Sequence, residues 1–147
     1  MSTETDAITS MPVLLRNDQY GITTLTLNRP EQYNALSEAM LSSLQGELDE
    51  IAQNELVRVV VIAANGNAYC AGHDLKEMRA STDRTFHQAL FDQCGRMMIS
   101  INRLPQPVIA SVNGIATAAG CQLVASCDLA VAVEDARFAV SGINVGL

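Results

Sequence analysis

The chain has 147 residues, of which 48% are hydrophobic and 17% charged, with no Trp and a formal net charge of -7. This length fits a single domain with one core, and the composition excludes a disordered or fibrous protein. Lys76 is the one lysine, so the sequence lacks the basic patch that a nucleic-acid partner requires.

We expect residues 1–11 to form a flexible N-terminus and residues 12–147 to form the core of one domain. The opening segment, "MSTETDAITSMP", contains no Arg and no long apolar run, so it resembles neither a secretory signal nor a transit peptide. No stretch reaches the 18 or more apolar residues of a membrane span. These features predict a cytoplasmic protein with no membrane partner.

The first elements are a hairpin, a helix and a strand. Residues 12–28 predict a β-hairpin whose turn falls at Asn17-Asp18 or at Tyr20-Gly21. Leucines at helical spacing predict a helix over residues 37–53, with its first residue, a serine, as the N-cap. The apolar run at residues 57–64 is typical of a parallel strand that is buried on both faces.

The second half continues the alternation of strands and helices. A loop and a polar, mobile linker at residues 78–85 lead to a helix over residues 85–102. A strand ending at Asn113-Gly114, a short helix of small residues and a strand within residues 128–133 follow. The pattern predicts an α/β fold with right-handed crossovers. Because the last residues are apolar, we expect either a fragment or a face covered by another subunit.

The cysteines and histidines offer no metal-ligand spacing and no Cys-x-x-Cys pair. We therefore expect no metal site and four free thiols, and no motif indicates a nicotinamide or flavin. One histidine, His87, lies among polar residues of a predicted helix and is expected to be solvated. The other, His73, directly follows an Ala-Gly pair at the exit of a strand.

Two strand exits carry the candidate chemistry: "AYCAGHDL" and "VNGIATAAGCQL". Each places small residues where another backbone or a ligand must come close, and each leads into a helix. The N-terminus of a helix presents unpaired N–H groups, which suit a developing negative charge on an oxygen. Two such groups directed at one carbonyl oxygen would form an oxyanion hole, whereas close packing is the simpler explanation of the small residues.

Three blocks of the sequence resemble the crotonase superfamily, the enoyl-CoA hydratase/isomerase fold. They are "LNRPEQYNALS", "VVVIAANGNAYCAGHDLKEM" and "PVIASVNGIATAAGCQLVASCDLAVAVEDARFAV", in the family's order and spacing. The segment at residues 116–132 resembles, more narrowly, one branch of this superfamily. The resemblance implies a fold of repeated ββα units. It also implies that this chain is the N-terminal part and lacks the C-terminal helical region, which usually helps to form homotrimers or dimers of trimers.

The resemblance further implies that an acyl-CoA or enoyl-CoA thioester is held at its carbonyl oxygen by the backbone N–H groups of His73 and Ala119. Ala119 stands where family members usually have glycine. The His73 side chain has two possible roles: a polar group at the mouth of the pocket, or a general acid or base.

The two carboxylates of the family's hydratases are absent from the corresponding positions. Gln122 stands at the first, where an amide cannot accept a proton from water near neutral pH, and Ser141-Gly142 stands at the second. Side chains near these positions could substitute for them, although each also has a structural explanation: His73, Asp74, Tyr69, Cys121 and Ser141. The expected function is thioester binding with doubtful hydratase activity.

Coenzyme A would bind along the first strand exit if the resemblance holds. The implied contact residues are Arg29, Cys70, Ala71, Gly72, Asp74, Leu75 and Lys76. Three cations are candidate partners of the phosphates: Arg29, Lys76 and Arg79. Asp74 is also a candidate helix cap. Three alternatives to a hydratase remain open: another enolate reaction, a non-catalytic acyl-CoA binder, or a truncated product that cannot complete its fold alone.

Overall fold

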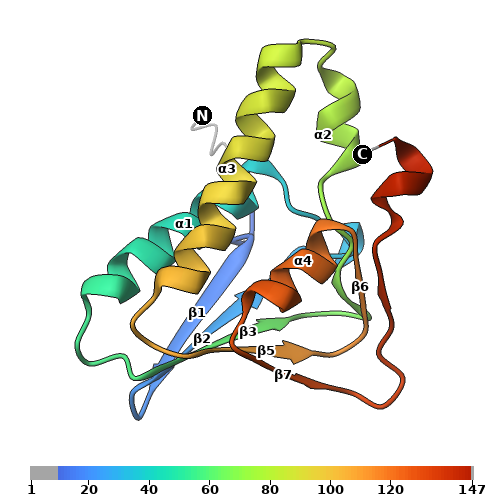
Figure 1. Cartoon of the computed structure of the whole chain (residues 1–147). Coiled ribbons are helices and arrows are strands. Elements are labelled where there is room, and N and C mark those ends of the chain that lie inside the picture. Colours follow the sequence, from blue (N-terminus) through green and yellow to red (C-terminus); the bar gives the residue numbers. More distant parts are fainter. Residues whose placement is uncertain (1–9, 147) are drawn as a thin grey trace, which may run out of the picture.

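The structure is a computed structural model that describes residues 10–146. A five-stranded sheet runs through the molecule in the order β1-β2-β3-β5-β7 (Figure 1). Its strands are β1 (Leu14–Gln19), β2 (Ile22–Leu27), β3 (Val59–Ala64), β5 (Val108–Val112) and β7 (Leu129–Ala132). β1 and β2 are antiparallel, whereas the other neighbouring strands of this sheet pair in parallel. This topology confirms the predicted α/β class.

The hairpin turn lies at Tyr20-Gly21, one of the two positions that the sequence allowed. Both residues have positive φ angles, of 53° and 79°. Two consecutive residues with positive φ give a turn whose twist matches that of the flanking strands. The predicted flexible segment, residues 1–11, lies mostly outside the described residues.

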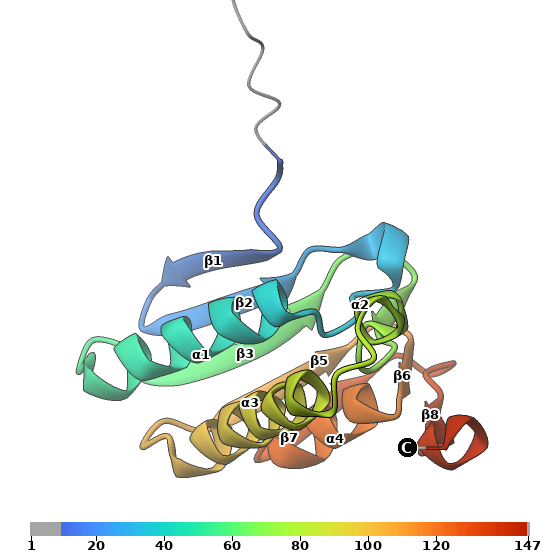
Figure 2. The same ribbon diagram turned by 90° about the horizontal axis from the view of Figure 1, so that it is seen from above.

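Three helices cover one face of the five-stranded sheet (Figure 2): α1 (Glu38–Gln53), α3 (Arg84–Arg103) and α4 (Ala119–Ser126). α1 has the predicted N-cap, because Ser37 Oγ accepts a hydrogen bond from the N–H of Met40 at 3.1 Å. Its buried side chains are Met40, Leu41, Leu44, Leu48 and Ile51. The core lies between this helical layer and the sheet. Within residues 10–146, no helix is long and apolar enough to cross a bilayer.

The prediction that the strand at residues 57–64 is buried on both faces is wrong. β3 buries Val60 and Ile62 completely, whereas the alternate residues Val59 and Val61 are only partly buried. The physical reason is that α1, α3 and α4 cover one face of the sheet alone. β7 is exposed along its whole length, including Leu129 and Val131.

A second, smaller sheet was not predicted. It contains β4 (Ala68–Cys70), β6 (Ile115–Thr117) and β8 (Phe138–Ala139), which pair in parallel in that order. Strands of two or three residues are too short to show alternation, so the sequence indicated a loop at β4 and placed residues 116–117 of β6 in the predicted short helix. Two 3-10 helices complete the chain: η1 (Pro30–Gln32) and η2 (Ser141–Val145).

The predicted polar linker at residues 78–85 is also wrong in part, because its first residues end a helix, α2 (Leu75–Ala80). α2 and α3 are joined by a short turn that His87 holds. The Nε2 atom of His87 lies 3.0 Å from the carbonyl oxygen of Met78 and 2.9 Å from that of Ser81. His87 is therefore half-buried and structural, and the expectation that it is merely solvated is wrong.

Candidate active site

The two strand exits meet at one edge of the small sheet. β4 and β6 are parallel neighbours, with Cys70 paired to Ala116, so the segments that follow them leave the sheet at the same edge. The first segment is fixed by Leu36, whose N–H donates to the carbonyl oxygen of Gly72 at 2.8 Å and whose carbonyl oxygen accepts from the N–H of Asp74. The pairing of β4 with β6 thereby brings together the predicted site residues of the two strand exits, which are far apart in the sequence.

The two segments touch at Gly72. A Cβ atom at this position would lie 3.0 Å from the Cβ of Ala118 and 3.2 Å from the backbone nitrogen of Ala119. These distances are shorter than almost all Cβ contacts, and Gly72 also has a positive φ of 93°, which glycine adopts without strain. Glycine is therefore required here so that the turn before α2 can lie against the turn before α4.

The start of α4 also lies very close to the end of β4. A Cβ atom on Gly120 would collide with the carbonyl group of Cys70. Ala119 is the first residue of α4, and the first N–H groups of a helix have no intrahelical acceptor. The N–H group of Ala119 has no acceptor within the helix and can therefore bind a ligand, as an oxyanion hole requires.

A cavity of about 500 Å³ opens beside these turns, between α3, α4 and η2. Three residues predicted from the sequence to be catalytic, His73, Ala119 and Gln122, all line it, together with Gly142. The remaining lining residues are Phe91, Ala118, Cys121, Ala125, Val140 and Ile143. The cavity is therefore mainly apolar, and its polar side chains are His73, Gln122 and the thiol of Cys121.

None of the described residues that line this cavity is Asp or Glu. Gln122 lies exposed on the first turn of α4, and Gly142 lies in η2. Gln122 and Gly142, the two positions where the resemblance implies carboxylates in hydratases, thus line the same cavity and contribute an amide and a hydrogen atom. No described residues form a group of three or more His, Cys, Asp or Glu that could hold a metal ion.

The His73 ring packs edge-to-face against Phe91, with ring centroids 5.0 Å apart and an interplanar angle of 80°. Burial lowers the pKa of His73 below its ordinary value of 6.5. Its Nδ1 atom is buried and has no hydrogen-bond partner. The side chain is therefore a neutral, desolvated imidazole at the wall of the cavity near pH 7.

Asp74 is a helix cap, as expected, and it is also half of an ion pair. Its carboxylate accepts hydrogen bonds from the N–H groups of Lys76 and Glu77 at the start of α2. The Arg29 guanidinium lies 2.9 Å from the same carboxylate. Burial raises the pKa of Asp74, but these hydrogen bonds and the Arg29 charge outweigh burial and leave the pKa below its usual value.

The Arg29 guanidinium is consequently held by contacts within the protein. Besides the ion pair it donates a hydrogen bond to the carbonyl oxygen of Ala35 at 2.9 Å, and its side chain is 18% exposed. Lys76 and Arg79 are exposed on α2 and remain available to an anionic ligand. The geometry therefore favours these two over Arg29 as phosphate partners.

The other implied contact residues differ in accessibility. Cys70 is fully buried, and burial raises the pKa of its thiol to about 12, so it remains protonated near neutral pH. Gly72 is buried and Ala71 partly buried, whereas Leu75 is exposed. Because the whole Cys70 residue is buried, a ligand along this segment would meet Ala71 and Leu75 rather than Cys70.

The candidate substitutes for the carboxylates fall into two groups, those buried in the fold and those at the cavity. Tyr69 is fully buried, its hydroxyl donates to the carbonyl oxygen of Ile62 at 3.2 Å, and burial raises its pKa well above the usual value. Tyr69 and Asp74 are therefore structural. His73 and Cys121 lie at the cavity, whereas Ser141 is not among its lining residues. All four cysteines are free thiols.

Phe91, Val140 and Ile143 line the cavity although no sequence pattern had indicated them as site residues. Phe91 adjoins the core residue Leu90 on α3, and an aromatic residue just outside an apolar helical stripe was the available signal. Val140 and Ile143 follow a two-residue strand, and nothing in their local pattern shows that they return to the site.

The fold, the paired strand exits and the apolar cavity define a member of the crotonase-fold proteins. The model of the enoyl-CoA hydratase/isomerase family matches residues 17–147, and the chain belongs to this family. It is similar to a crystal structure of an enoyl-CoA hydratase from Mycobacterium smegmatis, with 64% identity and a TM-score of 0.90, covering 92% of this chain and 53% of that one.

Two further similarities are to one branch of the family. Enoyl-CoA hydratase domain-containing protein 3 of Xenopus laevis is 48% identical over 136 residues, which are 92% of this chain and 46% of that protein. The crystal structure of the human protein of that name has 45% identity and a TM-score of 0.88, covering 92% of this chain and 53% of that chain. The narrower resemblance at residues 116–132 is confirmed. The chain spans about half the length of these relatives.

The comparisons contradict the expected cytoplasmic localisation. The curated proteins of this name from Xenopus laevis, Rattus norvegicus, Mus musculus and Homo sapiens are all called mitochondrial. The expectation rested on the composition of the first twelve residues, and such a segment does not determine the compartment of a chain that spans half of its relatives. We withdraw it.

Proposed function

We propose that this protein binds an acyl-CoA or enoyl-CoA thioester and polarises its carbonyl group through the backbone N–H groups of His73 and Ala119. The observation that carries the proposal is the contact of Gly72 with Ala118 and Ala119 beside the cavity. This contact supports the proposal because it brings two turns together, and among the described residues no backbone acceptor is found for the N–H groups of His73 and Ala119. Each donor of an oxyanion hole is worth about 10²–10³ in rate.

Coenzyme A would lie outside the cavity along α2. Lys76 and Arg79 are exposed there and can pair with phosphates, while Arg29 braces the turn through Asp74. The net charge of -7 repels an anionic ligand at long range, so local pairing must hold the phosphates. By analogy with the family, the complete protein would be a homotrimer or a dimer of trimers, which light scattering would test.

The acid–base chemistry of a two-carboxylate hydratase is not available from Gln122 and Gly142. Hydration of an enoyl thioester needs water that is activated at the β carbon and a proton at the α carbon. An amide can orient water but cannot accept its proton. The absence of each acid–base partner costs about 10²–10⁴ in rate. We therefore expect weak hydratase activity, with isomerisation, decarboxylation or thioester hydrolysis as the alternative enolate or acyl chemistry.

A second candidate function is a non-catalytic acyl-CoA binder. The observation that favours it is the lack of Asp and Glu among the described lining residues of the cavity. Turnover of any CoA thioester above the uncatalysed rate would exclude this second function, provided that the turnover disappears in the His73→Pro variant.

The first experiment measures the loss of enoyl-thioester absorbance when the protein meets trans-2-butenoyl-CoA. We expect little loss with the wild type and a measurable gain in the Gln122→Glu, Gly142→Glu double variant. Rapid hydration by the wild type would contradict the expected weak hydratase activity. It would leave the binding proposal standing.

Binding is tested separately by calorimetry with butyryl-CoA. His73→Pro removes one N–H donor and is expected to weaken binding about tenfold. His73→Ala is the matched control, because it removes the side chain but keeps the N–H group, and it should bind like the wild type. If butyryl-CoA does not bind to the wild type, the proposed function is wrong.

A further inference from the structure

The His73 side chain is a polar group in a mainly apolar environment, which its backbone role does not explain. Nδ1 is buried without a hydrogen-bond partner, whereas Nε2 is not among the buried polar atoms of residues 10–146 that lack one. Because Nδ1 alone of the two is enclosed, Nε2 is the nitrogen that remains accessible. The edge-to-face contact with Phe91 fixes the plane of the ring at the cavity wall.

This asymmetry selects one protonation state. An imidazolium would bury an unpaired N–H at Nδ1 in addition to a charge, and burial already lowers the pKa of His73. The neutral ring with its hydrogen on Nδ1 would bury a donor without an acceptor, whereas a hydrogen on Nε2 lies on the accessible nitrogen, where water or a ligand can accept it. The favoured form is therefore neutral, with a lone pair on Nδ1 and the hydrogen on Nε2.

We infer that the Nε2–H group of His73 is a specificity-determining donor, which binds an oxygen atom on the acyl chain of the thioester. This inference rests on the proposed function. The ligand class is an acyl-CoA that carries a hydroxyl or carbonyl oxygen close to the thioester, such as a 3-hydroxyacyl-CoA. In this tautomer His73 cannot take a proton at Nε2, so it acts as a donor rather than as a general base.

Because few other polar groups line the cavity, this donor should determine how well an oxygen-bearing acyl chain binds. Apart from His73, the lining side chains are apolar except for the Gln122 amide and the Cys121 thiol, which is a weak donor. A mainly apolar wall gives an acyl oxygen few partners in exchange for its lost hydration. An oxygen-bearing chain should therefore bind well only if it reaches His73 or Gln122, and these two possibilities can be separated by substitution.

The tautomer is tested in the unmodified protein by two-bond 1H–15N correlation NMR of its two histidines at pH 7. The correlation pattern differs between the two neutral tautomers and the imidazolium. The His73→Phe variant assigns the signals by removing one set. We expect the Nε2–H tautomer for His73, and a signal with hydrogen on Nδ1 or on both nitrogens would overturn the inference.

The specificity is tested by calorimetry with two ligands that differ by one hydroxyl group, 3-hydroxybutyryl-CoA and butyryl-CoA. We expect the wild type to prefer the hydroxylated ligand by roughly three- to tenfold. His73→Phe keeps an aromatic ring against Phe91 but has no donor, so the preference should vanish. His73→Gln restores an N–H donor at similar reach and should keep part of it.

Gln122→Leu is the matched control for the second polar group and should keep the preference. A preference that survives in His73→Phe, or that disappears only in Gln122→Leu, would overturn the inference. If the wild type binds both ligands equally, the inference is wrong while the proposed function stands. If it binds neither ligand, the proposed function is wrong and the inference falls with it.

Discussion

Ala118 is the residue whose backbone least suits its side chain. It has φ 50° and ψ -124°, a conformation that glycine adopts freely and that residues with a Cβ rarely adopt. The relief of this strain should exceed the entropy that glycine adds to the unfolded chain. We expect Ala118→Gly to raise the free energy of unfolding by about 1 kcal/mol in urea.

The control for this variant is Ala125→Gly, which lies on the exposed side of the same helix, α4. Its backbone is helical, so glycine there should lower the free energy of unfolding by about 1 kcal/mol. Equal effects of the two substitutions would show that Ala118 is not strained.

Substitution by alanine should have opposite effects on stability at Gly120 and at Gly46. A Cβ at Gly120 would collide with the carbonyl group of Cys70, whereas a Cβ at Gly46 on α1 would meet no atom within 4 Å. Gly120→Ala should therefore cost about 3 kcal/mol or more of stability, because the backbone of β4 must shift. Gly46→Ala should instead stabilise the protein by about 0.5–1 kcal/mol. Thermal unfolding measures both, and a well-tolerated Gly120→Ala would contradict the close packing of α4 on β4.

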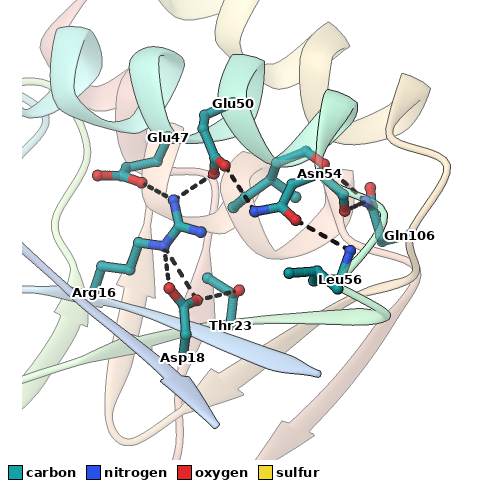
Figure 3. A network of polar contacts seen from close by, with 9 residues as sticks. Arg16, Asp18, Thr23, Glu47, Glu50, Asn54, Leu56 and Gln106 are labelled. Carbon is teal, nitrogen blue, oxygen red and sulfur yellow. Dashed lines mark hydrogen bonds and ion pairs between the residues drawn. The ribbon is translucent and has the colours of Figure 1, made fainter. Parts of the chain in front are cut away.

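At the scale of the elements, an ion network links β1 to α1 (Figure 3). Arg16 pairs with Asp18 at 2.9 Å and with Glu47 at 2.7 Å, and it also contacts Glu50. The Thr23 hydroxyl and Arg16 hold the pKa of Asp18 below its usual value, and hydrogen bonds from Arg16 and Asn54 lower the pKa of Glu50. The network therefore depends on ionised carboxylates.

This dependence predicts acid sensitivity. A carboxylate whose pKa is lowered on folding adds stability that is present above its unfolded value, 3.8 for Asp and 4.5 for Glu, and is lost as the pH falls further. We expect the urea midpoint to fall as the pH drops below about 4.5. Arg16→Met should flatten this fall, whereas Arg58→Met, an exposed control of equal charge change, should not. The same slope in both variants would show that the network has no role.

The elements also show what sequence reasoning can and cannot reach. α1 and α3 were predicted to within a residue or so of their bounds, because each is long and carries a regular apolar stripe. β4, β6 and β8 were missed because their pairing partners, not their own residues, make them strands. The resemblance to the family, rather than periodicity, indicated the meeting of His73 and Ala119.

For the whole molecule, the sequence indicated the α/β class but not which face of the sheet is covered. The exposed alternate positions of β3 and the exposure of β7 depend on where helices pack. The cavity illustrates the same limit. His73, Ala119 and Gln122 follow from motifs, whereas Phe91, Val140 and Ile143 reach the site through tertiary packing, which local patterns do not encode.

The parallel register has a consequence for folding kinetics. Ile22 pairs with Val59, Val60 with Val108, and Cys70 with Ala116, so each pairing closes a long loop that contains other elements. Loop closure of this kind must precede the contacts that reward it, which places such a sheet among slowly folding topologies. The turns at Gly72 and Ala118 can meet only once these loops have closed. We therefore expect the cavity to form late in folding, after the β1–β2 hairpin, whose pairing is local in the sequence.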